Sequence, residues 1–270
     1  MPLVSLEDKQ EIERFLRRNV YLHLYAIGDL DDFFWPHTAW HGWKTGETIT
    51  ALALIYTGSS VPTLLALSEH TPAMAELLEG LRGLLPRRFY AHLSPGLEGV
   101  FEGTHRLEPH GPHYKMALRD PQRVLSCDCS GVVRLGEADL AEIQEFYGVN
   151  YPGNWFDPRM LQTNQYFGLR ERDTLVSVAG VHVYSRQYRV AALGNVATHA
   201  SYRNRGCARR VTARLCQSLA EEVDHIGLNV KCGNRPAIAC YERLGFEIVA
   251  SYGEFMIELG AMPTLVVGMW

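Results

Sequence analysis

The sequence has few cysteines, no long apolar run and no excess of basic residues, and each absence excludes a class of protein. Only 6 of the 270 residues are cysteine, too few for a disulfide-dense secreted domain. No stretch of 18 or more apolar residues is present, so no helical membrane span is expected. The net charge of −4 disfavours a general nucleic-acid binder, which is usually basic.

The N-terminal stretch MPLVSLEDKQEIERF also lacks a basic segment followed by an apolar run, so no signal peptide is expected. We therefore expect a soluble, reduced, cytoplasmic protein without a nucleic-acid or membrane partner.

Metal-binding patterns are equally sparse. Cys127 and Cys129 have no second Cys or His pair at zinc spacing. Two histidine pairs lie in stretches that contain Pro or Gly rather than on clear helices, and these are His37 with His41 and His110 with His113. No metal site is expected.

What the sequence does contain is a globular composition, with 47% hydrophobic and 21% charged residues. Apolar periodicity predicts strands interleaved with helices, which is typical of an α/β protein, here an α+β fold with a mixed sheet. The expected helices are a first one capped by Ser5, then 21–30, 71–84, 95–102, 137–147, 158–163, 205–222 and 235–244. The expected strands are 48–56, 61–67, 88–92, 113–118, 131–135, 165–171, 174–184, 188–198, 226–231, 246–251 and 253–259.

A stretch that mixes Pro, Ser and charges, 119–130 (RDPQRVLSCDCS), separates two patterned halves. It predicts two domains, 1–125 and 126–270.

The segment 193–215 (LGNVATHASYRNRGCARRVTARL) carries the strongest chemical signal. A strand enters a short loop, and the loop begins a helix with one apolar face. The first backbone N–H groups of a helix have no intrahelical partner, and the helix dipole adds partial positive charge there. Gly206 and Ala208 leave room for an anion to approach the backbone. The basic residues of this segment are Arg203, Arg205, Arg209, Arg210 and Arg214. The segment therefore predicts a phosphate site, although Arg210 and Arg214 are also compatible with a solvated helix face.

Neither the P-loop pattern nor Gly-x-Gly-x-x-Gly is present. Instead, Arg203, Gly206 and Ala208 follow Gln/Arg-x-x-Gly-x-Gly/Ala. This pattern resembles the pyrophosphate signature of the GNAT superfamily of acyl-CoA-dependent N-acyltransferases. A second stretch, 229–246 (NVKCGNRPAIACYERLGF), is similar to the ending of that family at Asn234, Ala237, Tyr241, Gly245 and Phe246. The resemblance covers roughly residues 130–260.

The resemblance implies that acetyl-CoA (coenzyme A) binds as co-substrate between the strands 191–198 and 226–231, with its pyrophosphate on the amides of 205–208. The residues that it assigns to cofactor binding are Val196, Ala197, Thr198, Arg203, Asn204, Arg205, Gly206, Cys207, Ala208, Arg209, Asn234, Ala237 and Tyr241. The N–H near Val196 would hold the thioester carbonyl. A primary amine of a small molecule or amino acid would attack directly, and Tyr241 would protonate the leaving thiolate.

Several of these residues have a second reading. Tyr241 also fits simple packing against Phe246, and Asn234 also fits a helix cap. Asn195 is placed with the catalytic residues Tyr241 and Val196 as a candidate base. The other candidates are His182, His199, Glu145 or a water relay, and the sequence does not choose among them.

The acceptor side is equally open. Four aromatic side chains fit either an apolar pocket or the core, and these are Tyr147, Tyr151, Trp155 and Phe156. In the first half, Asp29, Asp31 and Asp32 fit either attraction of an amine or a helix end.

The first half resembles a degenerate copy of the second, because 68–74 (SEHTPAM) has no Gly-rich basic turn where the phosphate loop falls. A tandem GNAT-like fold with one working site is therefore expected. A non-catalytic acyl-CoA sensor or regulatory module is the alternative to an acetyltransferase, and a structural scaffold is a third class. The apolar run 263–270 allows packing on the first domain or on a second copy in a homodimer.

Overall fold

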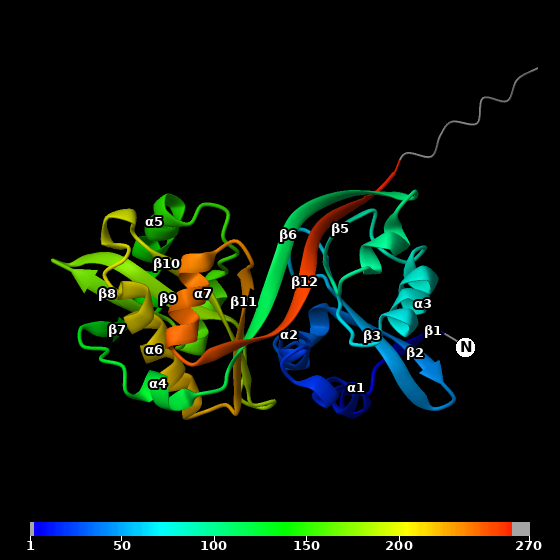
Figure 1. Ribbon diagram of the computed structural model, residues 1–270, viewed down its shortest axis with the longest axis horizontal. Coiled ribbons are helices and arrows are strands. Elements are labelled where there is room, and N and C mark those ends of the chain that lie inside the picture. The colour runs from blue at the N-terminus through cyan, green and yellow to red at the C-terminus, as the bar shows by residue number, and fades with distance from the viewer. Residues whose placement is uncertain (1–2, 261–270) are drawn as a thin grey trace, which may run out of the picture. The chain divides into compact units, whose positions relative to one another are not determined.

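The computed structural model describes residues 3–260, which fold into two compact units (Figure 1). Unit 1 takes the described residues up to 8, then 37–112, then those from 252 onward. Unit 2 takes 9–36 and 113–251. The apolar run 263–270 lies outside the described residues.

Unit 1 contains a mixed sheet, and among its described strands only β4 and β5 are parallel neighbours. The strand order is β1-β2-β3-β4-β5-β12. The bounds are β1 Leu3–Leu6, β2 Thr38–Thr45, β3 Thr48–Tyr56, β4 Thr63–Ala66, β5 Arg88–Leu93 and β12 Phe246–Leu259, with helix α3 Thr71–Leu81 and 3-10 helix η3 Leu97–Phe101. The 3-10 helix η2 Trp35–His37 leads into β2. Helix α3 begins with Pro72 in its first turn, and Leu77 and Leu78 on its buried face join a core with Ala51, Phe89 and Ile257.

Unit 2 repeats this plan in the order β6-β11-β10-β9-β8-β7, and only β10 and β11 are parallel. The strands are β6 His105–Leu118, β7 Val132–Arg134, β8 Phe167–Glu171, β9 Thr174–Ser185, β10 Val190–Thr198 and β11 His225–Lys231. The α-helices are α1 Lys9–Leu16, α2 Leu24–Gly28, α4 Pro121–Leu125, α5 Leu140–Asn150, α6 Cys207–Ala220 and α7 Arg235–Arg243. The 3-10 helices are η1 Arg17–Asn19, η4 Glu137–Asp139, η5 Pro158–Thr163 and η6 Ala200–Tyr202.

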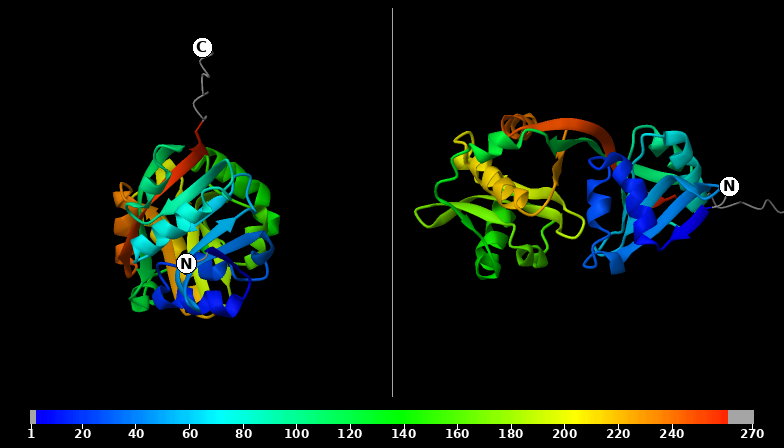
Figure 2. Two further views of the ribbon diagram at one scale, coloured as in Figure 1. Left: turned by 90° about the vertical axis from the view of Figure 1, so that its right-hand side faces the viewer. Right: turned by 90° about the horizontal axis from the view of Figure 1, so that it is seen from below.

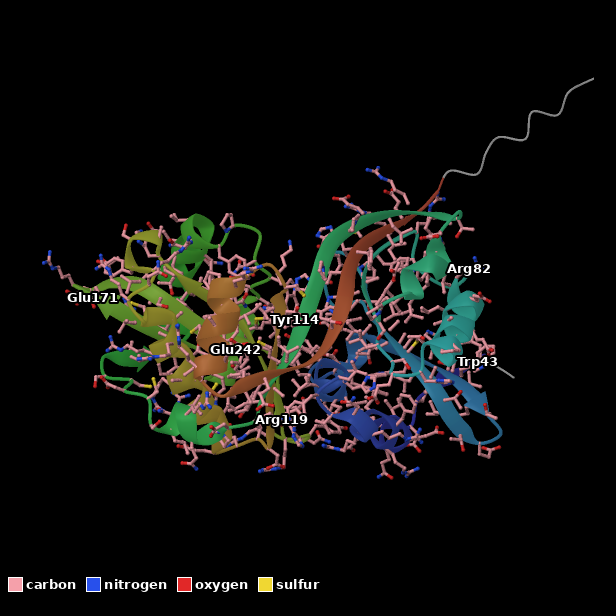
Figure 3. The ribbon with its side chains drawn as sticks, viewed as in Figure 1. Trp43, Arg82, Tyr114, Arg119, Glu171 and Glu242 are labelled. Atoms are coloured by element: carbon pink, nitrogen blue, oxygen red, sulfur yellow. The ribbon has the colours of Figure 1, made fainter. Side chains whose placement is uncertain are left out.

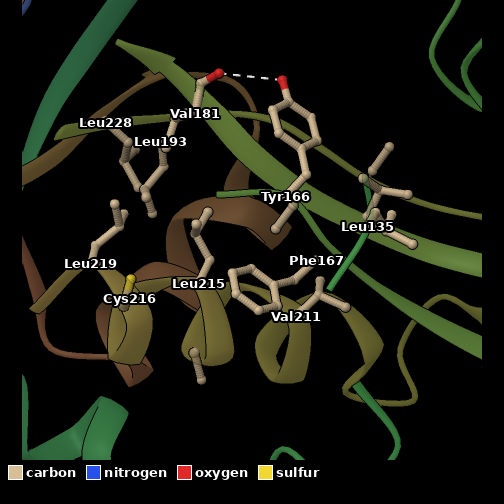
Figure 4. Packing of buried hydrophobic residues seen from close by; sticks show 14 of the residues in the cluster. Leu135, Tyr166, Phe167, Val181, Leu193, Val211, Leu215, Cys216, Leu219 and Leu228 are labelled. Carbon is tan, nitrogen blue, oxygen red and sulfur yellow. Dashed lines mark hydrogen bonds between the residues drawn. The ribbon is translucent and has the colours of Figure 1, made fainter. Parts of the chain in front are cut away.

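The sheet of unit 2 lies between helices. Figure 2 shows α6 and α7 on one face of it and α5 on the other. Helix α6 turns Val211, Leu215 and Leu219 toward the sheet, where they meet residues such as Phe167 and Leu228 (Figure 4). The spacings of three and four along α6 place these side chains on one face, so their burial fixes the helix start next to the end of β10.

The two halves of the chain follow the same order of elements. A strand, a helical region, three strands, a helix, a strand, a helical segment and a strand occur in this order from β1 to β6 and again from β7 to β12. The last strands are exchanged between the two halves of the sequence. Gly253–Glu258 of β12 pair with β5 in unit 1, and the end of β6 pairs with β11 in unit 2, for example Tyr114 with Val230. Figure 3 labels Tyr114 on β6.

Helices α1 and α2 also belong to unit 2, although they lie in the first half of the sequence. The Arg17 guanidinium donates to the Tyr188 carbonyl oxygen at 2.9 Å, and the Ser185 hydroxyl donates to Asp31 at 2.6 Å. Gly28 is required because a Cβ there would lie 1.9 Å from the Val183 side chain. The compact units are thus built from interleaved segments, whereas the predicted division into 1–125 and 126–270 follows the repeat and stays a prediction.

Several predicted elements are wrong in detail. Ser5 lies in β1 rather than capping a helix, because residues 3–6 all pair with β2, and Ser5 itself lies opposite His41. The sequence pattern missed β1 and β2, and it divided β12 into two strands at Ser251. Residues 95–102 and 158–163 form 3-10 rather than α-helices. Among residues 3–260, no helix combines the length and apolar character needed to cross a bilayer.

Candidate functional site

The parallel strands β10 and β11 separate along their length. They are paired from Val190 with His225 to Leu193 with Leu228, but β10 continues to Thr198 and β11 to Lys231. Beyond Leu193, the edge of β10 that faces β11 is therefore unpaired in the register. A substrate arm can approach backbone groups there that a continuous sheet would satisfy.

A β-bulge lies where the strands part. The register between β10 and β9 passes from Gly194 with Gly180 to Ala197 with Val178, so Asn195 and Val196 together face one residue. Asn195 has φ of 55°, a left-handed conformation that asparagine tolerates better than most residues. Within the described chain, the register gives Val196 no partner on β9 or β11, and this leaves its N–H as the candidate donor to a thioester carbonyl.

The side chain of Asn195 is 3% exposed and anchored on both ends. Its Nδ2 donates to the Tyr166 hydroxyl oxygen at 2.9 Å. Its Oδ1 lies 3.4 Å from Nδ2 of Asn154 and 3.2 Å from Nε2 of His182. These contacts favour a positioning role for Asn195 over the predicted role of a base.

The predicted phosphate turn follows β10 and is open. Residues 203–206 are exposed, Cys207 is buried and Ala208 is partly buried. Gly206, at φ of 80°, is the N-cap of α6 and makes no side-chain capping bond, and a Cβ on it would meet nothing within 4 Å. The start of α6 thus keeps its N–H groups uncapped by side chains and accessible, as an anion site requires.

The arginines of this segment divide into two groups. Arg203 and Arg209 are exposed beside the turn, and Arg205, also exposed, stacks over the Tyr202 ring at 5.2 Å. Arg210 donates to the Ser130 carbonyl oxygen, and Arg214 lies over the Phe167 ring at 5.3 Å. Arg203 is held as well, because its Nε donates to the Thr198 carbonyl oxygen at 3.3 Å. The two groups therefore differ in exposure: Arg203, Arg205 and Arg209 are exposed at the candidate anion site, whereas Arg210 and Arg214 are partly buried.

Helix α7 brings the second motif next to α6. Asn234 is its N-cap, and Oδ1 of Asn234 accepts the N–H of Ala237 at 3.3 Å. Burial raises the pKa of Cys240 on α7, and the nearby Arg209 guanidinium opposes that rise. Arg209 at the start of α6 therefore lies within electrostatic reach of α7.

Tyr241 on α7 is 8% exposed, with its ring centroid 5.9 Å from that of Phe246. Tyr241 thus packs against Phe246, and this packing does not exclude a chemical role for its hydroxyl. Burial raises its pKa, as does the neighbouring Cys240 thiol. A phenol in this setting keeps its proton, as a general acid must.

Tyr151 lies near Tyr241 on this helix and near Tyr147 on α5. Its charge, if ionised, would raise the pKa of both Tyr241 and Tyr147, so it lies within electrostatic reach of each. Tyr147 is buried at 3% exposure, whereas Tyr151 and Trp155 are 45% and 43% exposed. Of the aromatic residues predicted for a pocket or the core, Tyr147 is core, Phe156 packs against it, and Tyr151 and Trp155 remain at the surface.

The candidate bases differ in their surroundings. His182 is partly buried beside Asn195, with its ring 5.7 Å from that of Trp155. His199 uses Nδ1 to accept the N–H of Ser201 at 3.2 Å. Glu145 is exposed on α5, two residues from the buried Tyr147 and hence on another face of the helix. His182 is thus the candidate that stands next to the bulge.

The equivalent region of unit 1 is closed. Its parallel strands β4 and β5 stay paired to their ends, Ala66 with Leu93. Beyond them the N–H of Ser94 donates to the Ala66 carbonyl oxygen at 3.2 Å, and the N–H of Ser68 donates to the Ser94 hydroxyl at 2.9 Å. This arrangement leaves no split for a second cofactor.

The three aspartates that follow α2 do not form one acidic surface. Asp29 is buried, Asp31 accepts from Ser185, and Asp32 is ion-paired with Lys9 at 2.6 Å. The helix-end reading is therefore favoured. Residues 3–260 contain no group of three or more His, Cys, Asp or Glu arranged to hold a metal ion.

Comparison with known proteins agrees with this geometry. Residues 136–246 match the model of the acetyltransferase (GNAT) family. The segment thus carries a GNAT domain, and the predicted resemblance is confirmed. No curated protein matches the chain.

Solved structures resemble the whole chain in fold. A Drosophila protein has a TM-score of 0.70 at 14% identity, covering 94% of this chain and 98% of its own. A tandem GNAT protein from the clavulanic acid biosynthesis pathway has a TM-score of 0.57 at 16% identity, covering 97% and 99%. A GNAT-family acetyltransferase from Novosphingobium aromaticivorans has a TM-score of 0.57 at 23% identity, covering 77% and 89%. The tandem GNAT-like fold expected from the sequence is confirmed.

Proposed function

We propose that this protein is an N-acyltransferase that moves an acetyl group from acetyl-CoA to the primary amine of a small molecule or amino acid by direct attack. The observation that carries the proposal is the start of α6, which is exposed, led by a glycine and without a side-chain cap, directly after a parallel strand pair that opens. Two consecutive features of one strand–turn–helix segment thus match two groups of one ligand, its diphosphate and its thioester.

Each group of the chain has a task in this proposal. The amides of 205–208 bind the diphosphate, and Arg203, Arg205 and Arg209 add positive charge around it. When bound, acetyl-CoA supplies an activated acyl group as a thioester. The Val196 N–H donates to the thioester carbonyl oxygen, where negative charge develops during attack.

Two proton transfers complete the reaction. Tyr241 gives its proton to the departing thiolate, which is the role that its protonated, buried phenol suits. The proton of the attacking amine leaves to His182 or to a water relay. No covalent acyl-enzyme is required, so much of the acceleration comes from positioning the two reactants.

The test combines cofactor binding with turnover. We expect acetyl-CoA to bind in a calorimetric titration, and free CoA thiol to appear when a panel of small amines and amino acids is added. Tyr241→Phe should lower kcat by a factor on the order of 100 or more and leave acetyl-CoA affinity within about twofold, because the ring packing is retained.

The other possible outcomes of these two measurements distinguish the alternatives. Unchanged kcat in Tyr241→Phe would remove the assigned role of Tyr241. Binding without thiol release across the whole panel would favour the alternative, an acyl-CoA sensor. Absence of acetyl-CoA binding would contradict both.

A further inference from the structure

The hydroxyl of Tyr147 donates a hydrogen bond to the carbonyl oxygen of Asn195 at 2.7 Å, and both groups are buried. That carbonyl belongs to the same peptide unit as the N–H of Val196. A trans peptide is planar, with its C=O and N–H pointing in opposite directions. Fixing the carbonyl on Tyr147 therefore fixes the direction of the N–H, away from α5.

This peptide needs such a constraint. It lies in the bulge, where the strand register supplies no ladder partner to Val196. Asn195 also holds a left-handed φ of 55°, which costs a non-glycine residue free energy and persists only where its surroundings enforce it. Without an anchor, this peptide would be free to rotate, and the Val196 N–H would no longer point toward the thioester carbonyl.

The second anchor is the side chain of Asn195. Its Nδ2 donates to the Tyr166 hydroxyl oxygen, while the Tyr166 hydroxyl lies 3.2 Å from its own acceptor, the Val181 carbonyl oxygen (Figure 4). This assigns the amide orientation, because the oxygen of Tyr166 can only accept from Nδ2. Tyr147, on helix α5, thus holds the backbone of Asn195, and Tyr166, the residue before β8, holds its side chain.

Both tyrosines are suited to this use. Burial raises the pKa of each phenol, so each remains a neutral donor across the physiological range. A hydrogen bond to a peptide carbonyl also polarises the unit and strengthens its N–H as a donor.

We infer that Tyr147 is a positioning residue for acyl transfer, which aims and strengthens the Val196 N–H through the Asn195 carbonyl. This inference rests on the proposed function. It assigns a role in transition-state stabilisation to a residue whose side chain is buried in the core.

The decisive experiment is infrared difference spectroscopy of bound acetyl-CoA that carries a ¹³C label at the thioester carbonyl. A stronger hydrogen bond lowers the stretching frequency of that carbonyl. We expect Tyr147→Phe to bind acetyl-CoA within about twofold of wild type but to give a higher carbonyl frequency. Its kcat should fall about tenfold, less than the 100-fold or more for outright loss of an oxyanion donor.

The matched control is Tyr90→Phe in unit 1, which removes a hydroxyl that donates to Glu254 at 2.5 Å. It should leave both the carbonyl frequency and kcat unchanged. The comparison then separates the general effect of removing a partly buried hydroxyl from the specific effect on the orientation of the Val196 N–H. Equal frequencies and equal kcat in wild type and Tyr147→Phe would overturn the inference alone. A wild-type protein that gives no bound acetyl-CoA band would overturn the proposed function and the inference with it.

Discussion

Asn195 shows how the partners of a side chain decide between the roles that the sequence leaves open. Its backbone shares a peptide with Val196, and its side chain is held by Tyr166, Asn154 and His182. A polar residue in a strand of a predicted cleft fits the description of a base. Only its burial and its partners show that the side chain is engaged by the protein itself.

Asp29 makes a separate contribution at the residue scale, to stability. Burial raises the pKa of this carboxyl from 3.8 to about 8. The folded chain therefore keeps a proton that the unfolded chain has lost, so stability falls as the pH rises through this window, and the loss is complete above about pH 8. Below pH 6.5 the buried His23 opposes this slope, because burial and Lys115 lower its pKa to about 3.

The net effect should thus appear between pH 6.5 and 8. We expect the free energy of unfolding to fall by about 2 kcal/mol across that range, at about 1.4 kcal/mol per pH unit, and Asp29→Asn to abolish the fall. Urea unfolding at the two pH values measures it, with the exposed Asp32→Asn as control. A variant Asp29→Asn that keeps the full slope would exclude Asp29 as its source.

At the scale of elements, the strand–turn–helix from β10 to α6 was predictable and its details were not. The apolar spacing along α6 and the Gly206 start are local features, and local features are visible in a sequence. The bulge at Asn195 depends on the register with β9, and the Tyr147 bond depends on α5 lying across the sheet. Both are long-range facts that no spacing encodes.

The same contrast explains the missed strands. β2 (TAWHGWKT) mixes apolar, aromatic and polar residues without strict alternation, so its sequence alone does not indicate a strand. Its burial depends on its neighbours β1 and β3, and β1 was itself unrecognised in the sequence pattern. β12 was divided at Ser251, the residue after which the strand passes from unit 2 into unit 1. The lack of a second phosphate turn was predictable from 68–74. The hydrogen bonds of Ser68 and Ser94 beyond the ends of β4 and β5 were not predictable.

At the scale of the whole molecule, each half of the sequence contains the full order of elements, but each compact unit takes segments from both halves. Unit 2 needs β6 beside β11 and the helices α1 and α2, all of which precede residue 126. A fragment of 126–270 would expose the edge of β11, and it would lose the buried Met116 and Ala117.

We therefore expect 126–270 produced alone to lack a cooperative thermal transition, and 1–125 to behave likewise. Produced together from two genes, the two fragments should copurify and show the circular dichroism spectrum of the intact chain. A fragment 126–270 that folds cooperatively by itself would contradict the exchange of strands between the two halves.

In the proposed function, acetyl-CoA binding depends most on contact between its diphosphate and the open start of α6, and a matched pair of glycines tests this directly. Gly206 and Gly103 have φ of 80° and 75°, both are exposed, and at neither would a Cβ meet an atom within 4 Å. Gly206→Glu and Gly103→Glu thus impose the same strain and the same charge, one at the turn and one in unit 1. In calorimetric titrations with acetyl-CoA, we predict that Gly206→Glu loses binding while Gly103→Glu keeps wild-type affinity. Equal affinity in the two variants would contradict the account.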